Sequence, residues 1–139
     1  MPPVRWVTPR DYGELAENSL RHWHRVRQDS PTKFFPSLST GYDPRPWIGA
    51  VDCRIVTNTT VTAFRKICED AKKYSDETGE IYLLIGPLDE WGEGSIGYPN
   101  RQHGFGMLEA VRDTFDEKPP EGWPVNCSPE DVGLVCPQR

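Results

Sequence analysis

The sequence lacks the cysteine and histidine spacing of a metal site. Its four cysteines, Cys53, Cys68, Cys127 and Cys136, form no Cys-x-x-Cys pair, and no histidine follows them at zinc-finger distance. We therefore expect no metal and no cofactor. Cys68 falls on the apolar stripe of an expected helix and is predicted to lie in the core. Cys127 and Cys136 could pair if the parent protein is exported, and free thiols are the alternative.

Long apolar runs and an excess of basic residues are also missing. No stretch approaches the ~20 apolar residues of a membrane-spanning helix, and residues 1–5 contain no apolar segment of a signal peptide. The 16 Lys and Arg residues are outnumbered by 21 Asp and Glu residues, which argues against a phosphate-backbone partner. We expect a soluble protein with neither a membrane nor a nucleic acid as partner. Its localisation stays open.

Two segments have the apolar periodicity of amphipathic helices. The first helix is expected from Thr8, its N-cap, to about Gln28. The second begins after Thr57 or Asn58, either of which can cap it, and fades near Ser75.

Strands are expected between these helices. Residues 33–40 are predicted to be one strand, and the apolar run in residues 80–88 is typical of a strand buried on both faces of a parallel sheet. Residues 48–56 show no period and are predicted to be a long loop. A third helix is expected at 105–115, with Phe115 facing inward. The order helix–strand–helix–strand–helix predicts an α/β fold with a parallel pair of strands.

The segment after the second expected strand places two glutamates three residues apart, Glu90 and Glu93, beside Trp91. Active sites of α/β folds gather where strands lead into loops at their carboxyl ends. Two carboxylates near an aromatic ring suit glycoside hydrolysis, in which one protonates the leaving oxygen and the other assists attack. A solvated acidic loop is the alternative, and composition alone does not separate the two.

The loop after the first expected strand carries Tyr42, Asp43, Arg45 and Trp47 among prolines. Aromatic faces stack on the C–H faces of a sugar, and charged groups bind its hydroxyls. A rigid loop that only packs is the alternative.

The glycine-rich loop 94–106 carries Tyr98 and His103. Such a loop lets the backbone approach a ligand closely. His103 is a candidate for binding a substrate hydroxyl, and capping the next helix is an equal alternative.

Three segments resemble, in order, parts of one family. Residues 89–95, Asp-Glu-Trp-Gly-Glu-Gly-Ser, are similar to the Asn-Glu-Trp-x-Glu-Gly signature of the glycoside hydrolase family 99-like (WbsX-like) proteins. Residues 35–47 are similar to that family's P-x-x-x-x-G-W-D-x-x-R loop, and residues 104–111 to its last helix. The resemblance covers roughly residues 10 to 116. Within it, Asp89 replaces the signature's asparagine, and Tyr98 stands where the family has an acidic residue.

The resemblance implies a (β/α)8 TIM barrel that hydrolyses α-mannoside-type linkages with retention. By position, Glu90 would act as base on the sugar's own 2-hydroxyl, through an anhydro-sugar intermediate, and Glu93 as general acid and then base. Trp91 would shape the pocket, and the two loops described above would hold the carbohydrate.

A complete barrel needs about 250 residues, and the chain has 139. We therefore predict a partial barrel: residues 1–116 form its carboxyl-terminal strand–helix units, and residues 117–139 form a proline-rich tail. Open strand edges indicate completion by a missing amino-terminal half or by self-association. The leading hypothesis is a retaining glycoside hydrolase. A carbohydrate-binding or inactive fragment is the alternative, and a glycosyltransferase ranks below both.

Overall fold

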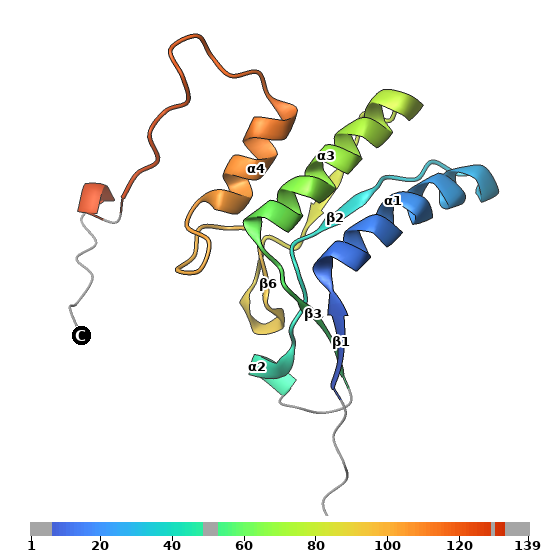
Figure 1. The fold of residues 1–139 in the computed structure, drawn as a ribbon, viewed down its shortest axis with the longest axis horizontal. Helices are drawn as coiled ribbons and strands as arrows, with labels where there is room; N and C mark the ends of the chain where they lie inside the picture. The colour runs from blue at the N-terminus through green and yellow to red at the C-terminus, as the bar shows by residue number, and fades with distance from the viewer. Residues whose placement is uncertain (1–6, 49–52, 129, 133–139) are drawn as a thin grey trace, which may run out of the picture.

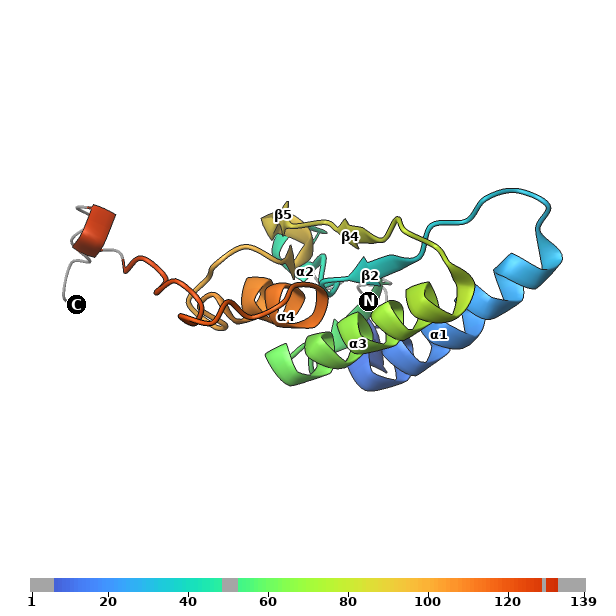
Figure 2. The same ribbon diagram turned by 90° about the horizontal axis from the view of Figure 1, so that it is seen from above.

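The computed structural model describes residues 7–48, 53–128 and 130–132, and within them helices lie on one side of short parallel strand pairs (Figures 1 and 2). In chain order the elements are β1 (Val7–Asp11), α1 (Tyr12–Asp29), β2 (Ser37–Ser39), α2 (Arg45–Ile48), β3 (Cys53–Thr57), α3 (Val61–Thr78), β4 (Leu84–Gly86), β5 (Asp89–Glu90), β6 (Ser95–Ile96) and α4 (Gly106–Phe115), with 3-10 turns at Trp91–Glu93 and Glu130–Val132.

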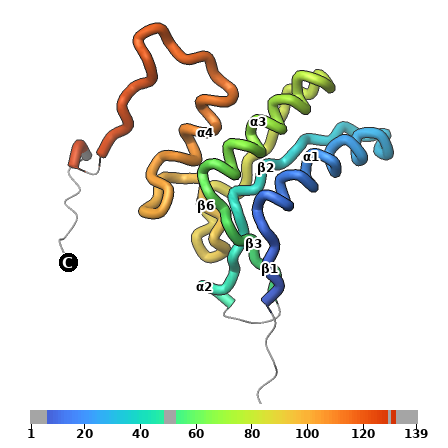
Figure 3. Tube along the Cα trace, viewed as in Figure 1, coloured from blue at the N-terminus to red at the C-terminus, as the bar shows by residue number. Residues whose placement is uncertain are grey.

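The strands form two parallel pairs and one antiparallel hairpin. β1 pairs with β3, β2 pairs with β4, and β5 pairs antiparallel with β6. The segment after β2 crosses to the β1–β3 pair (Figure 3), where the backbone N–H of Val56 donates to the carbonyl of Tyr42 at 2.7 Å. The expected α/β class is confirmed, and so is the parallel pairing of the strands within 33–40 and 80–88. The barrel itself stays a prediction.

The expected start of the first helix at Thr8 is wrong. Residues 7–11 are extended in β1, because their pairing with β3 outweighs the local fit of a Thr-Pro pair to a helix start. The helix begins at Tyr12, and the carboxylate of Asp11 caps it by accepting a hydrogen bond from Gly13 N at 2.8 Å. It ends at Asp29, one residue from the predicted end.

The long loop expected at residues 48–56 is wrong at both ends, because residue 48 ends α2 and residues 53–56 belong to β3. Residues 49–52 of this segment lie outside the described residues. Thr57 is the last residue of β3, and Asn58 lies two residues before the N-cap position of α3, so neither residue caps that helix. Thr60 does so, with its hydroxyl accepting from Ala63 N at 3.2 Å. The helix continues past the expected fading point to a left-handed Gly79, with φ of 70°.

The core lies between the helices and the inner face of the β2–β4 pair, as the view from above shows (Figure 2). Phe64, Ile67 and Tyr74 of α3 are buried there against Leu38 of β2. Cys68 is fully buried beside them, which confirms its predicted place in the core. Burial raises the pKa of its thiol to about 12, because the thiolate would lose its hydration.

The strand expected at 80–88 is shorter than predicted and is not buried on both faces. Only Leu84–Gly86 pairs with β2, and the side chains of Ile81, Tyr82 and Leu84 are 79%, 58% and 53% exposed. Ile85 packs on the core. A continuous apolar run indicates a hydrophobic segment, but it does not establish that a second layer covers it. Phe115, expected to face inward, is likewise exposed, at the last turn of α4.

The tail after α4 lies partly back on that helix. The Arg112 guanidinium stands over the Trp123 ring at 4.6 Å from its centroid, and Asn126 Nδ2 donates to Glu109 Oε1 at 2.6 Å. The described part of the tail is thus tied to α4 before it extends away (Figure 1). The candidate pairing of Cys127 with Cys136 cannot be placed, because Cys136 lies outside the described residues.

Candidate functional site

A pocket of about 360 Å3 lies at the carboxyl ends of β2 and β3. We call it the loop pocket. Its lining side chains come from four segments: Tyr42 and Asp43 after β2, Asn58 after β3, Trp91 from the β5–β6 hairpin, and His103 from the turn before α4. This edge of a parallel arrangement is where α/β proteins bind their ligands.

The hairpin that carries the two glutamates is bonded directly to the segment after β2. The backbone N–H of Asp43 donates to the carbonyl of Glu93 at 2.5 Å. The buried hydroxyl of Ser95 donates to the carbonyl of Gly41 at 2.7 Å. Two walls of the loop pocket are therefore one hydrogen-bonded unit.

Two glycines permit this close approach. Gly41 has φ of 113°, and a Cβ there would lie 3.2 Å from the Thr59 hydroxyl oxygen. Gly94 has φ of 62°, and a Cβ there would lie 3.0 Å from Cβ of Asp43. Both positions combine left-handed backbone with tight packing, so a larger residue would separate the two walls.

Asp43 faces the loop pocket as a fixed negative charge. Arg45 binds its carboxylate in a bidentate manner, with Nε 2.8 Å from Oδ1 and Nη2 2.5 Å from Oδ2. The hydrogen bond from this guanidinium holds the pKa of Asp43 below its usual range. Arg45 does not itself line the pocket. The pair therefore supplies a positioned carboxylate that stays ionised at neutral pH.

The two glutamates stand on the hairpin beside the loop pocket and are not among its lining residues. Glu90 is exposed in β5, opposite Ser95 of β6. Glu93 ends the 3-10 turn and is half-buried. Trp91, which lies between them in sequence, does line the pocket.

Two of the aromatic candidates lie outside the loop pocket. Trp47 lies on α2 and is 73% exposed. It stands close to the hairpin, because a Cβ added at Gly92 would lie 3.7 Å from the Cβ of Trp47. Tyr98 is exposed in the loop after β6. The structure thus gathers four of the predicted site residues into one pocket and leaves five outside it. Those inside are Tyr42, Asp43, Trp91 and His103; those outside are Arg45, Trp47, Glu90, Glu93 and Tyr98.

The turn before α4 shows how His103 is placed. The side-chain oxygen of Asn100 accepts from the backbone N–H groups of Gln102 and His103, both at 2.9 Å, and its amide donates to the carbonyl of Tyr98 at 3.0 Å. Phe105 is the N-cap residue of α4 and no side chain bonds there. The capping role considered for His103 is therefore wrong, and its ring lines the loop pocket instead.

No protein-family model, curated protein or solved structure matches this chain. Across residues 7–48, 53–128 and 130–132, no helix is long and apolar enough to cross a membrane. In the same ranges, no three His, Cys, Asp or Glu side chains are grouped to hold a metal ion.

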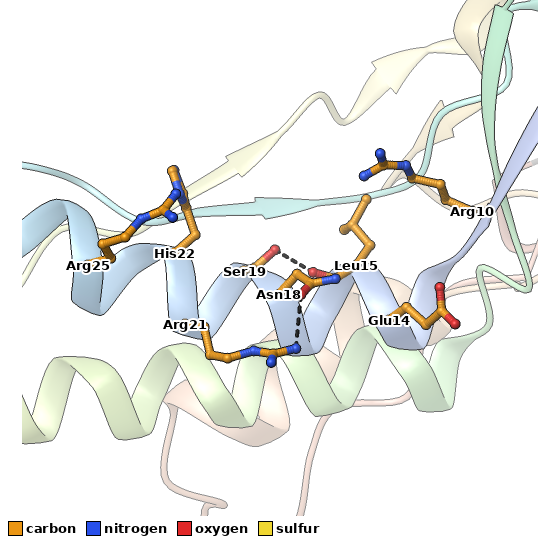
Figure 4. Close-up of a pocket in the computed structure, with 8 residues that line it drawn as sticks. All are labelled: Arg10, Glu14, Leu15, Asn18, Ser19, Arg21, His22 and Arg25. Atoms are coloured by element: carbon orange, nitrogen blue, oxygen red, sulfur yellow. Dashed lines mark hydrogen bonds between the residues drawn. The ribbon is translucent and has the colours of Figure 1, made fainter.

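A wider hollow of about 790 Å3 runs along the outer surface of α1 and contains none of the predicted site residues. Figure 4 shows Arg10, His22 and Arg25 on one side of this helix. Other lining groups are bonded within the helix: Arg21 donates to Asn18 at 2.9 Å. The hollow is an open helix face, and we do not assign a ligand to it.

The sequence interpretation missed Asn58 and Asn100 as pocket residues. The sequence predicts Asn58 only as a possible helix cap, because the residues before it show no period and are expected to be loop. Once β3 is recognised, Asn58 stands just past the carboxyl end of a parallel strand, the position that the general rule for α/β proteins singles out.

Proposed function

We propose that the loop pocket binds a sugar and that the chain is the carboxyl-terminal part of a retaining glycoside hydrolase acting on α-mannoside-type glycans. One observation carries the proposal. The hairpin with the family-like signature is hydrogen-bonded to the segment after β2, so that Trp91, Tyr42 and Asp43 line one pocket at the carboxyl ends of parallel strands. Indole and phenol rings suit the C–H faces of a sugar, and a carboxylate suits its hydroxyls.

The reaction follows from the resemblance. Glu90 takes the proton of the sugar's 2-hydroxyl while that oxygen attacks the anomeric carbon, and Glu93 protonates the leaving oxygen. In the second step Glu93 removes a proton from water, the water oxygen bonds to the anomeric carbon, and Glu90 returns its proton to the 2-oxygen. The hydrogen bond from the backbone N–H of Asp43 to the carbonyl of Glu93 would fix the position of Glu93, the proposed acid/base, relative to the pocket.

Catalysis by these glutamates needs a more enclosed site than the described residues provide. Glu90 is exposed, and the outer face of the β2–β4 pair, where Leu84 is exposed, has no covering helix among the described elements (Figure 2). We propose that further strand–helix units of the complete protein, or a second copy of the chain, cover this face.

The test is hydrolysis of aryl α-mannosides and α-mannose oligosaccharides by the complete protein. Glu90→Gln and Glu93→Gln should each lower turnover by roughly 10²–10⁴-fold, the usual contribution of general acid–base catalysis. Glu117→Gln, an exposed change in the tail, is the matched control and should keep full activity. Full turnover in both active-site variants would refute the proposal.

Sugar binding without hydrolysis is the second candidate, and the absence of both glutamates from the pocket lining favours it. Calorimetric titration with α-mannose oligosaccharides separates the two functions. A binding module would bind these sugars without forming product, would lose affinity in Trp91→Ala, and would keep its affinity in Glu90→Gln.

A further inference from the structure

We infer that Asn58 is a specificity-determining residue of the loop pocket, and that its side-chain carbonyl accepts a hydrogen bond from one sugar hydroxyl. This inference rests on the proposed function, because it names a contact in the same pocket. It adds a residue that the family-like motifs do not include.

The backbone of Asn58 is the first observation. Among the described residues, it is the only non-glycine residue with positive φ, at 57°. Left-handed backbone disfavours residues that carry a Cβ, and asparagine tolerates it better than most. A turn between β3 and α3 needs only this conformation, which glycine adopts without strain. The presence of asparagine therefore points to a role for its side chain.

The orientation of the Asn58 amide is fixed by Asp11. Its Nδ2 donates to Oδ2 of Asp11 at 2.7 Å, and the other oxygen of Asp11 accepts from Gly13 N. This amide is the main cause that lowers the pKa of Asp11, so the carboxyl is ionised at neutral pH and can only accept. The nitrogen of the Asn58 amide must then face Asp11. Its oxygen is left available, with no described residue donating to it.

Hydrogen-bonding capacity in the pocket leaves the same atom free. The carboxylate of Asp43 is held by Arg45, and the side chain of Asn100 is used within its own turn. Asn58 and His103 also line the pocket, and no described group bonds to the Asn58 oxygen or to the ring of His103. Asn58 is itself exposed, so its oxygen distinguishes a hydroxyl from a hydrogen or a methyl ether only where the bound sugar covers it. The analogue then leaves the covered oxygen without a donor.

Asn58→Gly is the decisive variant, because glycine keeps the φ of 57° and removes the amide. The complete protein is titrated with α-mannotriose and with its monodeoxy analogues. For wild type, one deoxy position should weaken binding by about threefold to tenfold, the effect of one neutral hydrogen bond. Asn58→Gly should bind α-mannotriose more weakly by a similar factor and should no longer distinguish that deoxy analogue. Relief of the left-handed strain should offset the loss of the hydrogen bond to Asp11, so its unfolding midpoint should lie close to that of wild type.

Two further variants serve as controls. Asp11→Ser keeps an N-cap for α1 but removes the anchor of the amide, and it should lose part of the same discrimination. Arg25→Ala, on the outer face of α1, should bind every sugar as wild type does. If Asn58→Gly binds the whole series as wild type does, the inference is overturned while the proposed function stands. If wild type binds none of these sugars, both are overturned.

Discussion

Replacing Gly94 with alanine tests whether the hairpin and the segment after β2 are one unit. An added Cβ would lie 3.0 Å from Cβ, 3.2 Å from N and 3.3 Å from O of Asp43. Two of these three neighbours are backbone atoms, which cannot rotate away. The same Asp43 N–H donates to the carbonyl of Glu93, so relief of the contact should stretch the bond that joins the two walls.

The expected loss of stability has two parts. Left-handed backbone costs an alanine about 1–2 kcal/mol, and a less flexible unfolded chain offsets about 0.4–1 kcal/mol of this. Crowding against packed atoms adds about 1–3 kcal/mol, so Gly94→Ala should lower the free energy of unfolding by roughly 1–5 kcal/mol. Gly79→Ala is the matched control: its φ is 70°, and a Cβ there would meet nothing within 4 Å. It should lose only the backbone part, about 1 kcal/mol.

Urea unfolding followed by tryptophan fluorescence measures both variants, with calorimetric titration of sugar binding alongside. Gly94→Ala should unfold at lower urea than Gly79→Ala and should bind α-mannose oligosaccharides more weakly, because the walls that carry Trp91 and Asp43 separate. Equal stability of the two variants would show that the close approach at Gly94 is relaxed at no cost. The tight coupling of the two walls would then be wrong.

Three other predictions concern charge, reactivity and packing. Since the folded-state pKa of Asp43 is lowered from 3.8, its ion pair stabilises the fold above that value, and this stabilisation is lost as the pH falls through the lowered pKa. In Asp43→Asn, the free energy of unfolding should therefore change less over that pH range than in wild type. The same pH dependence in both proteins would contradict the ion pair between Asp43 and Arg45. Cys68, buried with its pKa raised to about 12, should react with a thiol reagent only on unfolding, unlike half-buried Cys53; equal rates in native protein would contradict its burial. Phe64→Ala should cost about 3–5 kcal/mol in urea unfolding, whereas Phe35→Ala, at a 38% exposed side chain, should cost less than half as much.

The helices α1, α3 and α4 were predictable because each carries an apolar stripe, whereas the four-residue α2, which has no buried residue, was expected to be loop. In α3, Phe64, Ile67 and Cys68 recur at helical spacing and are all buried, and the predicted helix is present although its cap was misplaced. The strands were harder, because the paired segments are two to five residues long. β1 has a proline at its centre and β3 has no alternating pattern, so only their pairing with one another makes them strands. That information is not local to either segment.

The candidate site was predictable in part for the same reason. Tyr42, Asp43 and Trp91 follow strands that the sequence did indicate, and the structure places all three in one pocket. Asn58 follows the strand that was missed, and its role depends on Asp11, 47 residues away in the chain. Spacing along a sequence cannot reveal a contact of that range.

Exposure of Glu90 and exposure of the sheet have a common origin. β4 leads within a few residues into β5, and both lie on the side away from α1 and α3 (Figure 2). Leu84 and Glu90 are exposed on these consecutive strands. A surface that packs on the apolar face of β4 would thus stand beside the glutamates and would reduce their contact with water. Exclusion of water from Glu93 is what its proposed role as general acid requires. Completion of the sheet and completion of the catalytic site would then be a single event, and sugar binding by the loop pocket could precede it.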